Sequence, residues 1–367
     1  MRERIPLASL TTLGVGGPCS VLVDAIDPKS LRTACTLPAL EGMPFVPLGG
    51  GSNVVAADRP RPLAVIRLHD ATLQVPRVED DCVILKVGAG LRLDDLAEFS
   101  VNEGLAGIEA LSGVPGTVGA AVVQNVGAYG GEMSRCVERV EALDLQNGKI
   151  RLFRREECGF AYRRSRFKGP DLGRYVVVRV ELRLKRRNVA SVCHDELHAA
   201  LGVSEAPITE IRACILELRR RKGMLQERGL SSPRSAGCFF VNPTLSIPAF
   251  HRLRTRLGAG RDIPAHPAGK GRVKIPAAFL VEQAGFPKGF RHGGVGLSDR
   301  HALALVNFGG GSASELLELA ARIQRKVEER FGVVLAPEPV FVGFEPEELP
   351  LKEALVIPYA RRAVSPP

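Results

Sequence analysis

Aromatic residues are scarce in this sequence, which contains no tryptophan and only four tyrosines. Few platforms are therefore available on which the bases of a nucleic acid could stack. No apolar run approaches the roughly 18 residues that a membrane-spanning helix needs. The first residues, Met1–Pro6, lack the apolar core of a signal peptide. We therefore expect a cytoplasmic protein that binds neither nucleic acid nor a membrane.

Paired cysteines are also missing. The eight cysteines show no CxxC spacing and no Cys/His cluster at metal-ligand spacing, so we expect free thiols that mostly fill the core and no structural zinc site. They are Cys19, Cys35, Cys82, Cys136, Cys158, Cys193, Cys214 and Cys238.

Basic residues outnumber acidic ones. The chain has 367 residues, with 50 Lys and Arg against 40 Asp and Glu, and its formal net charge is +10. This excess favours anionic partners. The basic residues are spread out and match no nucleic-acid-binding motif. Phosphorylated cofactors and substrates are therefore the better candidates.

Two glycine-rich segments interrupt the first part of the chain. A predicted strand, Phe45–Leu48, leads into Gly49-Gly50-Gly51-Ser52-Asn53, and a longer run of small residues covers Gly107–Gly131. Glycines let the backbone approach a diphosphate closely, and successive free N–H groups bind anions. A flexible turn or a helix-packing segment would be the structural alternatives. Two such segments suggest a dinucleotide cofactor, and Thr11–Pro18 has no helix spacing that fits a Rossmann fingerprint.

Hydrophobic periodicity predicts the main elements. Helices are expected at Pro28–Leu37, Leu93–Asn102, Glu210–Arg221 and Ala313–Arg330. Strands are expected at Ser20–Val23, Phe45–Leu48, Leu63–Arg67, Cys82–Val87, Val137–Leu145, Ile150–Phe153, Val176–Leu184, His301–Asn307 and Val333–Leu335. Gln146-Asn147-Gly148 is a hairpin turn signature, and a domain boundary is expected near residues 186–205.

The segment Pro233–Pro243 is predicted to present one thiol, Cys238, on a turn of small residues beside Phe239 and Phe240. Such a thiol is either a nucleophile or proton donor, or a buried structural cysteine. The basic end of the Glu210–Arg221 helix either complements the helix C-terminus or attracts a diphosphate.

Several segments resemble, in order, those of the UDP-N-acetylenolpyruvoylglucosamine reductase family, and the resemblance runs from about Thr11 to Gly343. The matching segments are Leu48–Asn53, Gly113–Gly119, Gln124–Gly130, Tyr162-Arg163, Ala236–Pro243 and Pro337-Glu338. The resemblance implies an α+β protein with an FAD-binding domain of the p-cresol methylhydroxylase/vanillyl-alcohol oxidase type. That domain would cover residues 1–195, as two subdomains of about 1–65 and 66–195. A C-terminal α+β substrate-binding domain at 205–343 and a peripheral tail at 344–367 would follow.

The same resemblance implies the cofactor and the reaction. NADPH would reduce FAD, which would pass a hydride to C3 of the enolpyruvyl ether of UDP-N-acetylglucosamine, yielding UDP-N-acetylmuramate for peptidoglycan synthesis. We expect a monomer. The implied FAD contacts are Gly49, Gly50, Gly51, Ser52, Asn53, Ser112, Gly116, Thr117 and Gly119.

By position, Arg163 would be the cation on the substrate carboxylate, Glu338 its protonated companion and Cys238 the proton donor to C2. Many family members carry serine where this chain has Cys238. A thiol, with a pKa near 8.5, is mostly protonated at neutral pH and is more acidic than an alcohol, so we expect a donor that is also open to alkylation. The implied nucleotide-sugar contacts are Arg219, Lys222, Asn242, Lys274 and Gln283.

A second departure is Cys193-His194-Asp195, where family members often place a tyrosine over the substrate diphosphate. Either His194 replaces that tyrosine or the contact is made differently. Two rival functions stay open at this point. One is a related FAD oxidoreductase that oxidises an alcohol or phenol, and the other is a basic nucleic-acid-binding protein without catalysis.

Overall fold

The computed structural model describes residues 1–37, 40, 42–60, 62–226, 234–258 and 262–357. The predictions for Pro233 and for residues 358–367 of the tail therefore concern residues outside the described ranges. The α-helices are α1 (Pro28–Cys35), α2 (Leu93–Asn102), α3 (Val118–Gln124), α4 (Asp195–Leu201), α5 (Ile208–Arg221), α6 (Ile247–Leu257), α7 (Ala277–Gln283) and α8 (Ala313–Phe331).

A small, mostly parallel sheet opens the chain. Its order is β1 (Arg2–Glu3), β2 (Val21–Ala25), β5 (Ala64–Leu68) and β3 (Phe45–Pro47), with β1 antiparallel at the edge. Helix α1 packs on this sheet and is capped at its N-terminus by Asp27, whose carboxylate accepts a hydrogen bond from Ser30 N at 2.6 Å. Strand β3 ends directly before the first glycine-rich segment, as predicted.

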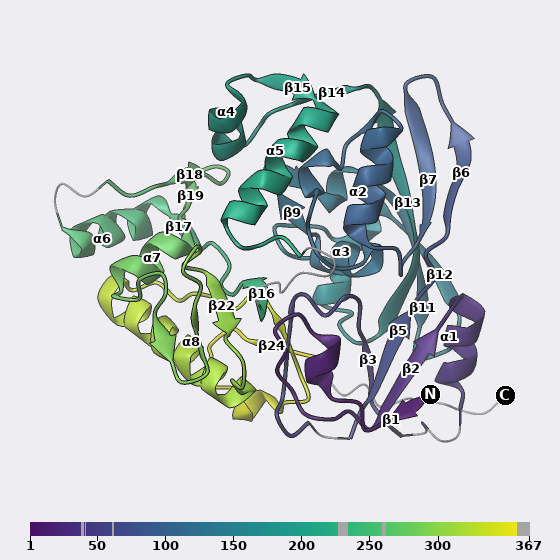
Figure 1. Cartoon of the computed structure of the whole chain (residues 1–367), viewed down its shortest axis with the longest axis horizontal. Coiled ribbons are helices and arrows are strands. Elements are labelled where there is room, and N and C mark those ends of the chain that lie inside the picture. Colours follow the sequence, from purple (N-terminus) through teal and green to yellow (C-terminus); the bar gives the residue numbers. More distant parts are fainter. Residues whose placement is uncertain (38–39, 41, 61, 227–233, 259–261, 358–367) are drawn as a thin grey trace.

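The largest sheet is antiparallel and carries α2 and α3 on one face (Figure 1). Its order is β12 (Ile150–Arg154), β11 (Val137–Asp144), β13 (Tyr175–Arg186), β7 (Cys82–Gly88) and β6 (Leu73–Val78), and β8 (Leu105–Ala106) pairs with the end of β13. The hairpin predicted around Asn147 is confirmed because β11 and β12 are antiparallel neighbours. The second glycine-rich segment forms a short helix, α3, which ends where Asn125 adopts a φ of 47°.

The C-terminal part is built on a second antiparallel sheet. This sheet consists of β16 (Arg234–Cys238), β22 (Ala304–Asn307), β21 (Val295–Leu297) and β20 (Arg291–His292). Beside it lies a small sheet of β17 (Thr244–Ser246), β19 (Arg272–Lys274) and β18 (His266–Pro267). Helix α8 has the predicted capping box between Ser312 and Glu315, and it ends at Gly332, whose φ is 68°.

Three parallel strands join the two ends of the chain. They are β4 (Val54–Ala56), β23 (Val340–Val342) and β24 (Leu355–Val356). The predicted strand at Val333–Leu335 is wrong, because that segment pairs with no strand. Val333 and Leu335 are 6% and 0% exposed, so their apolar alternation reflects burial against α8 and its neighbours rather than a ladder. Short pairs elsewhere are β9 (Gly127–Ala128) with β10 (Gly131–Glu132), and β14 (Val189–Ser191) with β15 (Glu205–Pro207).

The largest core cluster draws on both ends of the sequence. Leu13, Val15, Val55 and Ala57 are buried in it together with residues from 239 to 351. This core cluster therefore joins residues of both proposed domains. The domain limits at 195 and 205 stay a prediction. Within the described ranges, the helices are all too short or too polar to cross a bilayer.

Candidate active site

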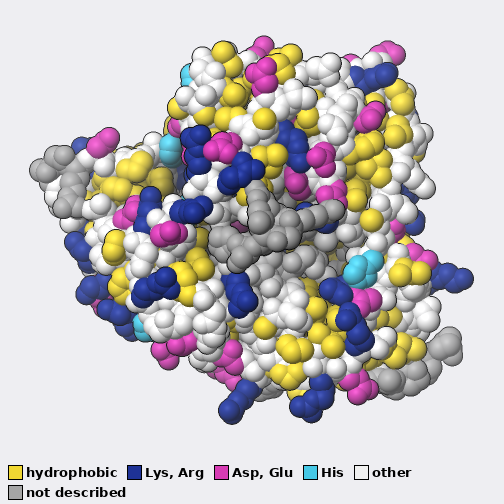
Figure 2. All heavy atoms as spheres, viewed as in Figure 1, with side chains coloured by type: hydrophobic (Ala, Val, Ile, Leu, Met, Phe, Trp, Pro, Cys, Tyr) yellow, Lys and Arg dark blue, Asp and Glu magenta, His cyan; other side chains and the backbone are white. Residues whose placement is uncertain are grey.

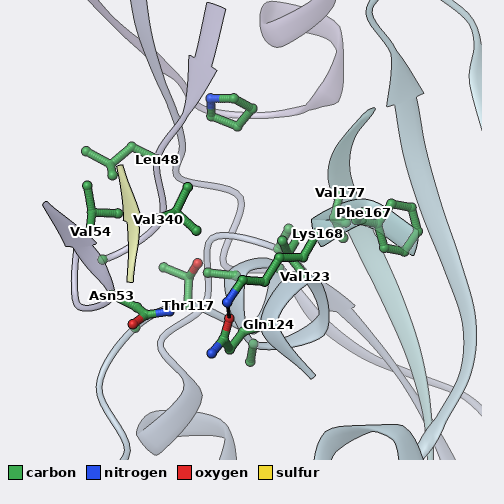
Figure 3. Close-up of a pocket in the computed structure, with 18 of the residues that line it drawn as sticks. Leu48, Asn53, Val54, Thr117, Val123, Gln124, Phe167, Lys168, Val177 and Val340 are labelled. Carbon is green, nitrogen blue, oxygen red and sulfur yellow. Dashed lines mark hydrogen bonds between the residues drawn. The ribbon is translucent and has the colours of Figure 1, made fainter. Parts of the chain in front are cut away.

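A cavity lies where the first sheet, α3 and β13 meet (Figure 3). It encloses about 1270 Å³, including its solvent-open mouth. The predicted cofactor residues Gly49, Gly50, Gly51, Ser52, Asn53, Gly116, Thr117 and Gly119 all line it. Ser112 lies outside this lining, because its side chain is 0% exposed and donates a hydrogen bond to Glu109 O at 2.7 Å.

The two glycine-rich segments pack so closely that a side chain at Gly49 or Gly50 would clash with the opposite segment. A Cβ on Gly50 would lie 2.9 Å from Gly116 Cα, and a Cβ on Gly49 would lie 2.7 Å from Thr117 Oγ1. Gly51 has a φ of 63°, which favours glycine. The absence of side chains at these positions leaves backbone N–H groups open to an anionic ligand.

Apart from Gln124 and Lys168, the rest of the cavity wall is mostly apolar. It is formed by side chains from both sheets and from the end of the chain, including Leu48, Ile66, Leu68, Val123, Phe167, Val177, Val340 and Ile357. An apolar wall suits a flat ring system, and a glycine-rich rim suits a diphosphate. The residues present therefore fit FAD.

Arg163 and Glu338 form an ion pair near this cavity, with Arg163 Nε donating to Glu338 Oε1 at 2.8 Å. Arg163 Nη2 also donates to Gly127 O at 2.7 Å, so the guanidinium is held on two sides. Arg163 has a φ of 56°, an uncommon backbone conformation for a residue with a side chain, and such conformations gather at functional sites. Burial is the largest single influence and acts to lower the pKa of Arg163, but Glu338, Tyr162 and Cys238 together outweigh it and the pKa is raised.

Cys238 reaches the same place from the C-terminal sheet. It ends strand β16 at a register irregularity, after Gly237 with a φ of 75°, rather than sitting on a free turn as predicted. Glu338 N donates to Phe239 O at 2.8 Å, and Phe240 forms a bridge with Pro337. The thiol segment and the Pro337-Glu338 segment are therefore hydrogen-bonded neighbours.

The environment of Cys238 changes one expectation from the sequence. Burial, followed by the Glu338 carboxylate, raises the pKa of the Cys238 thiol to about 12. The thiol is neutral at physiological pH, as expected, but it is a weaker acid than a free cysteine. Arg163, Arg219 and Lys222 act in the opposite direction and favour the thiolate.

Three residues that line the cavity also donate hydrogen bonds to Glu338, which lies directly behind them. Gln124 Nε2 donates to Glu338 Oε1 at 2.9 Å, and Lys168 Nζ and Asn53 Nδ2 donate to its main-chain oxygen at 2.9 and 3.3 Å. Figure 3 shows the Lys168 amine directed at Gln124, with Asn53 on the neighbouring wall. The candidate cofactor site and the candidate acid are thus parts of one site.

Arg219 and Lys222, at the basic end of α5, make different kinds of contact. Arg219 is 8% exposed, and it donates to Gly113 O at 3.0 Å and to Met224 O at 2.8 Å, so it supports the backbone of the second glycine-rich segment. Burial lowers the pKa of Arg219. Lys222 pairs with Glu196 and lies over the Tyr129 ring, 5.6 Å from its centroid.

The remaining predicted substrate residues lie around α7. Asn242 Oδ1 accepts a hydrogen bond from Ala277 N at 2.8 Å, at the start of that helix. Lys274 Nζ lies 4.5 Å from the centroid of the Tyr162 ring, beside Arg163. Gln283 is half-buried at the last residue of α7. Figure 2 shows basic side chains, with acidic ones among them, gathered between the part that carries α5 and the part that carries α6 to α8.

His194 packs edge-on against Tyr129, with ring centroids 5.3 Å apart. Its Nδ1 atom is buried and meets no hydrogen-bond partner among the described residues. Burial lowers the pKa of His194, and the neighbouring Lys222 acts in the same direction. The histidine is therefore next to a predicted substrate cation.

Two families of known proteins match different parts of this chain. Residues 19–153 match the FAD binding domain family, and residues 228–342 match the family described as UDP-N-acetylenolpyruvoylglucosamine reductase, C-terminal domain. The UDP-N-acetylenolpyruvoylglucosamine reductase of Thermobifida fusca is 43% identical over 93% of this chain and 98% of its own length. This chain belongs to the UDP-N-acetylenolpyruvoylglucosamine reductase family.

Other members of the family agree. The reductase of Streptomyces coelicolor is 40% identical over 92% of this chain and 89% of its own length. The crystal structure of the Thermus caldophilus enzyme is 31% identical and superposes with a TM-score of 0.64, covering 93% of this chain and 98% of that one. The chain is therefore an FAD-dependent oxidoreductase of this family, with an FAD-binding domain and the C-terminal domain of these reductases.

Gln124 and Lys168 were not predicted as site residues, although Gln124 belongs to the matching segment Gln124–Gly130. They lie on different elements, Gln124 on α3 and Lys168 on the short 3-10 helix Arg166–Lys168, and only the tertiary structure brings them to Glu338. A lysine that follows the Tyr162-Arg163 pair within an aromatic segment was the one visible hint. The contribution of Ile357 to the cavity was also missed, because the tail was expected to be peripheral.

Proposed function

We propose that the protein reduces UDP-N-acetylglucosamine enolpyruvate to UDP-N-acetylmuramate with NADPH as the reductant, for peptidoglycan precursor synthesis. The observation that carries the proposal is the grouping of Arg163, Glu338 and Cys238 beside residues that line the FAD cavity, since Gln124, which lines it, donates to Glu338 Oε1. An acid, a cation and a proton donor are what this reaction needs beside the cofactor.

The atoms balance as follows. FAD bound in the cavity would supply the hydride for C3, and NADPH would be the source of that hydride. Addition at C3 leaves the electron pair of the former double bond on C2, where it is conjugated with the substrate carboxylate. C2 then takes one proton, so the substrate gains two electrons and two hydrogens, and solvent replaces the proton that the protein gives up.

Arg163 and Glu338 stabilise the charge that develops on the substrate carboxylate. The guanidinium is already fixed by Gly127 O and by the Glu338 carboxyl, so little reorganisation is required when the charge appears. A protonated Glu338 would donate a further hydrogen bond. Removing one donor of this kind costs about 10²–10³-fold in turnover in other enzymes.

Cys238 is the proposed donor of the proton to C2. With its pKa raised to about 12, the thiol enters the reaction protonated at every pH at which the enzyme is expected to work. The carbanion-like C2 is a strong base and accepts a proton even from a weak acid. Arg163, Arg219 and Lys222 favour the thiolate that remains until solvent reprotonates it.

The nucleotide sugar is proposed to lie along Arg219, Lys222, Asn242, Lys274 and Gln283. Lys222 and Lys274 provide the ammonium groups for its diphosphate, each above a tyrosine ring. Arg219 acts mainly through Gly113, because its guanidinium is bound to backbone oxygens. We place His194 at the same subsite, where its unpartnered Nδ1 can accept or donate one hydrogen bond.

The test follows bound FAD by its visible absorbance. NADPH should bleach the spectrum of the purified protein, and UDP-N-acetylglucosamine enolpyruvate should restore it under anaerobic conditions. In D₂O the product should carry one solvent-derived deuterium at C2, detected by NMR. Bleaching of the oxidised spectrum by an alcohol or a phenol, together with no recovery of the NADPH-bleached spectrum on adding the enolpyruvate, would overturn the proposal.

We also propose that the protein works as a monomer in the cytoplasm, where NADPH is available, and without nucleic acid. Light scattering of the FAD-loaded protein at micromolar concentration should give the mass of one chain, 39.5 kDa. Twice that mass would contradict the monomer.

A further inference from the structure

Lys168 is a cation at the cavity wall to which the proposed reaction assigns no role. It follows the buried Phe167, and its amine lies between α3 and the Pro337-Glu338 segment. Nζ donates to Gln124 Oε1 at 2.5 Å and to the main-chain oxygen of Glu338 at 2.9 Å. The first of these contacts is drawn in Figure 3.

The charge of Lys168 determines how the Gln124 amide is turned. An ammonium group donates hydrogen bonds and accepts none. The amide oxygen of Gln124 must therefore face Lys168, which turns the amide NH₂ toward Glu338, where it donates to Oε1 at 2.9 Å. A neutral amine would accept as well as donate, so it would impose no such orientation.

Glu338 Oε1 then receives two N–H groups, because Arg163 Nε donates to the same atom at 2.8 Å. An oxygen that accepts two hydrogen bonds from nitrogen has no place for a proton between them. The proton of an acidic Glu338 must consequently sit on Oε2, the oxygen that these two donors leave free. A flipped Gln124 amide would reverse this, because its oxygen would draw the proton to Oε1.

We propose that Lys168 is a positioning residue that acts through Gln124 to keep the acid proton of Glu338 on Oε2, available to the substrate carboxylate. This inference rests on the proposed role of Glu338 in the reaction. Asn53 assists by holding the main-chain oxygen of Glu338 from the other side of the cavity.

The arrangement is sensitive to pH. Burial and the neighbouring Arg163 lower the pKa of Lys168 to about 8, and Glu338 opposes this shift. Arg163 and Glu338 are the charged groups that act on the amine, while Gln124 on α3 is neutral. Turnover should therefore decline as the pH rises past about 8, when the amine becomes neutral and the Gln124 amide is free to turn.

The experiment compares Lys168→Met and Lys168→Arg with the wild type, and uses Lys149→Met, in the exposed β11–β12 turn, as the control. Each variant is first checked for retained FAD by its absorbance spectrum, and for substrate affinity by the perturbation of that spectrum. We expect Lys168→Met to keep substrate affinity within about threefold, to lose about 10²-fold in kcat and to lack the alkaline decline. Lys168→Arg should restore most of kcat and move the decline to higher pH.

A double-mutant cycle tests the route through Gln124. If Lys168 acts through the amide, the Lys168→Met/Gln124→Met variant should be about as slow as the slower single variant, whereas independent effects would multiply. The inference would be overturned if the losses in kcat of the two single variants multiplied in the double variant. It would also be overturned if Lys168→Met changed only KM, or if it lost FAD but kept a normal kcat per bound FAD. A wild type that does not turn over the enolpyruvate would instead refute the proposed function, which separates the two failures.

Discussion

At the scale of single residues, the position of the Cys238 thiol and its pKa are two properties that the sequence alone could not give. Strand β16 carries the thiol that we propose as the proton donor, and burial at that position raises its pKa to about 12. It is thus a reliably protonated donor and a poor nucleophile. This combination suits a step that consumes a proton and forms no covalent bond to sulfur.

We expect Cys238→Ala to lower kcat by about 10²–10⁴-fold, the usual contribution of a positioned proton donor, and Cys238→Ser to keep substantial turnover. A serine hydroxyl fills nearly the same space and also carries a proton. Single-turnover reoxidation of FAD by the enolpyruvate measures the step, with bound FAD as the control for folding. An alanine variant with unchanged reoxidation would show that the proton comes from elsewhere.

The raised pKa also predicts slow alkylation. At pH 8 a thiol of pKa about 12 is ionised in about one molecule in ten thousand, so iodoacetamide should modify Cys238 far more slowly than the exposed Cys193. Peptide mapping by mass spectrometry over a time course measures both rates in one sample. Equal rates at the two residues would mean that the thiol is ionised more readily than its burial implies.

At the scale of elements, strand β24 connects the end of the chain to the cofactor cavity. It extends the parallel sheet of β4 and β23, and Ile357, which follows it, donates its N–H to Phe341 O at 3.0 Å and lines the cavity. The residues beyond Gly343 therefore contribute to the cavity wall, although they read as a peripheral tail in the sequence.

Ending the chain after Ala354, which removes β24 and Ile357, should weaken FAD binding by about tenfold, roughly the effect of losing part of one buried isoleucine contact. Fluorescence titration of the stripped protein with FAD measures the affinity. The matched control ends after Ile357, so it keeps β24 and loses the same residues beyond it. Equal affinities in the two truncated proteins would show that β24 has no part in the site.

At the scale of the whole molecule, contacts between distant segments hold the two ends of the chain together. Asp58, which follows β4, accepts hydrogen bonds from Ala313 N at 2.8 Å and from Ser314 N at 3.0 Å, at the start of α8. Asn307 Nδ2 donates to Gly14 O at 3.1 Å. The site depends on this closure, because Cys238 and Glu338 come from the C-terminal part and Arg163 from the N-terminal part.

Asp58→Ala should lower the free energy of unfolding by about 1–2 kcal/mol, because it leaves two N–H groups at the positive end of α8 without their carboxylate. Glu329→Ala is the control, since Glu329 lies on the same helix but makes an exposed pair with Lys326. Urea unfolding followed by far-ultraviolet circular dichroism measures both. Equal losses in the two variants would contradict the role of Asp58 as a link between the ends.

Much of the architecture could be predicted from local patterns. Leu93–Asn102 and the capping box of Ser312 and Glu315 were predicted as the structure has them, because helix periodicity and caps depend on near neighbours in sequence. The strand predicted at Val333–Leu335 was wrong for the opposite reason. Burial alone produces the same apolar alternation, and pairing depends on residues far away.

By itself, the sequence determined the class of this protein: its glycine-rich segments, its basic charge and its ordered motifs pointed to an FAD-binding reductase, and the comparisons confirm that family. Only the tertiary structure decided how the site is assembled. Arg163, Gln124, Lys168 and Glu338 lie as far as 214 positions apart in sequence but meet through hydrogen bonds of 2.5–2.9 Å. Such distances, and the burial that raises one pKa and lowers another, arise from the packing of distant segments.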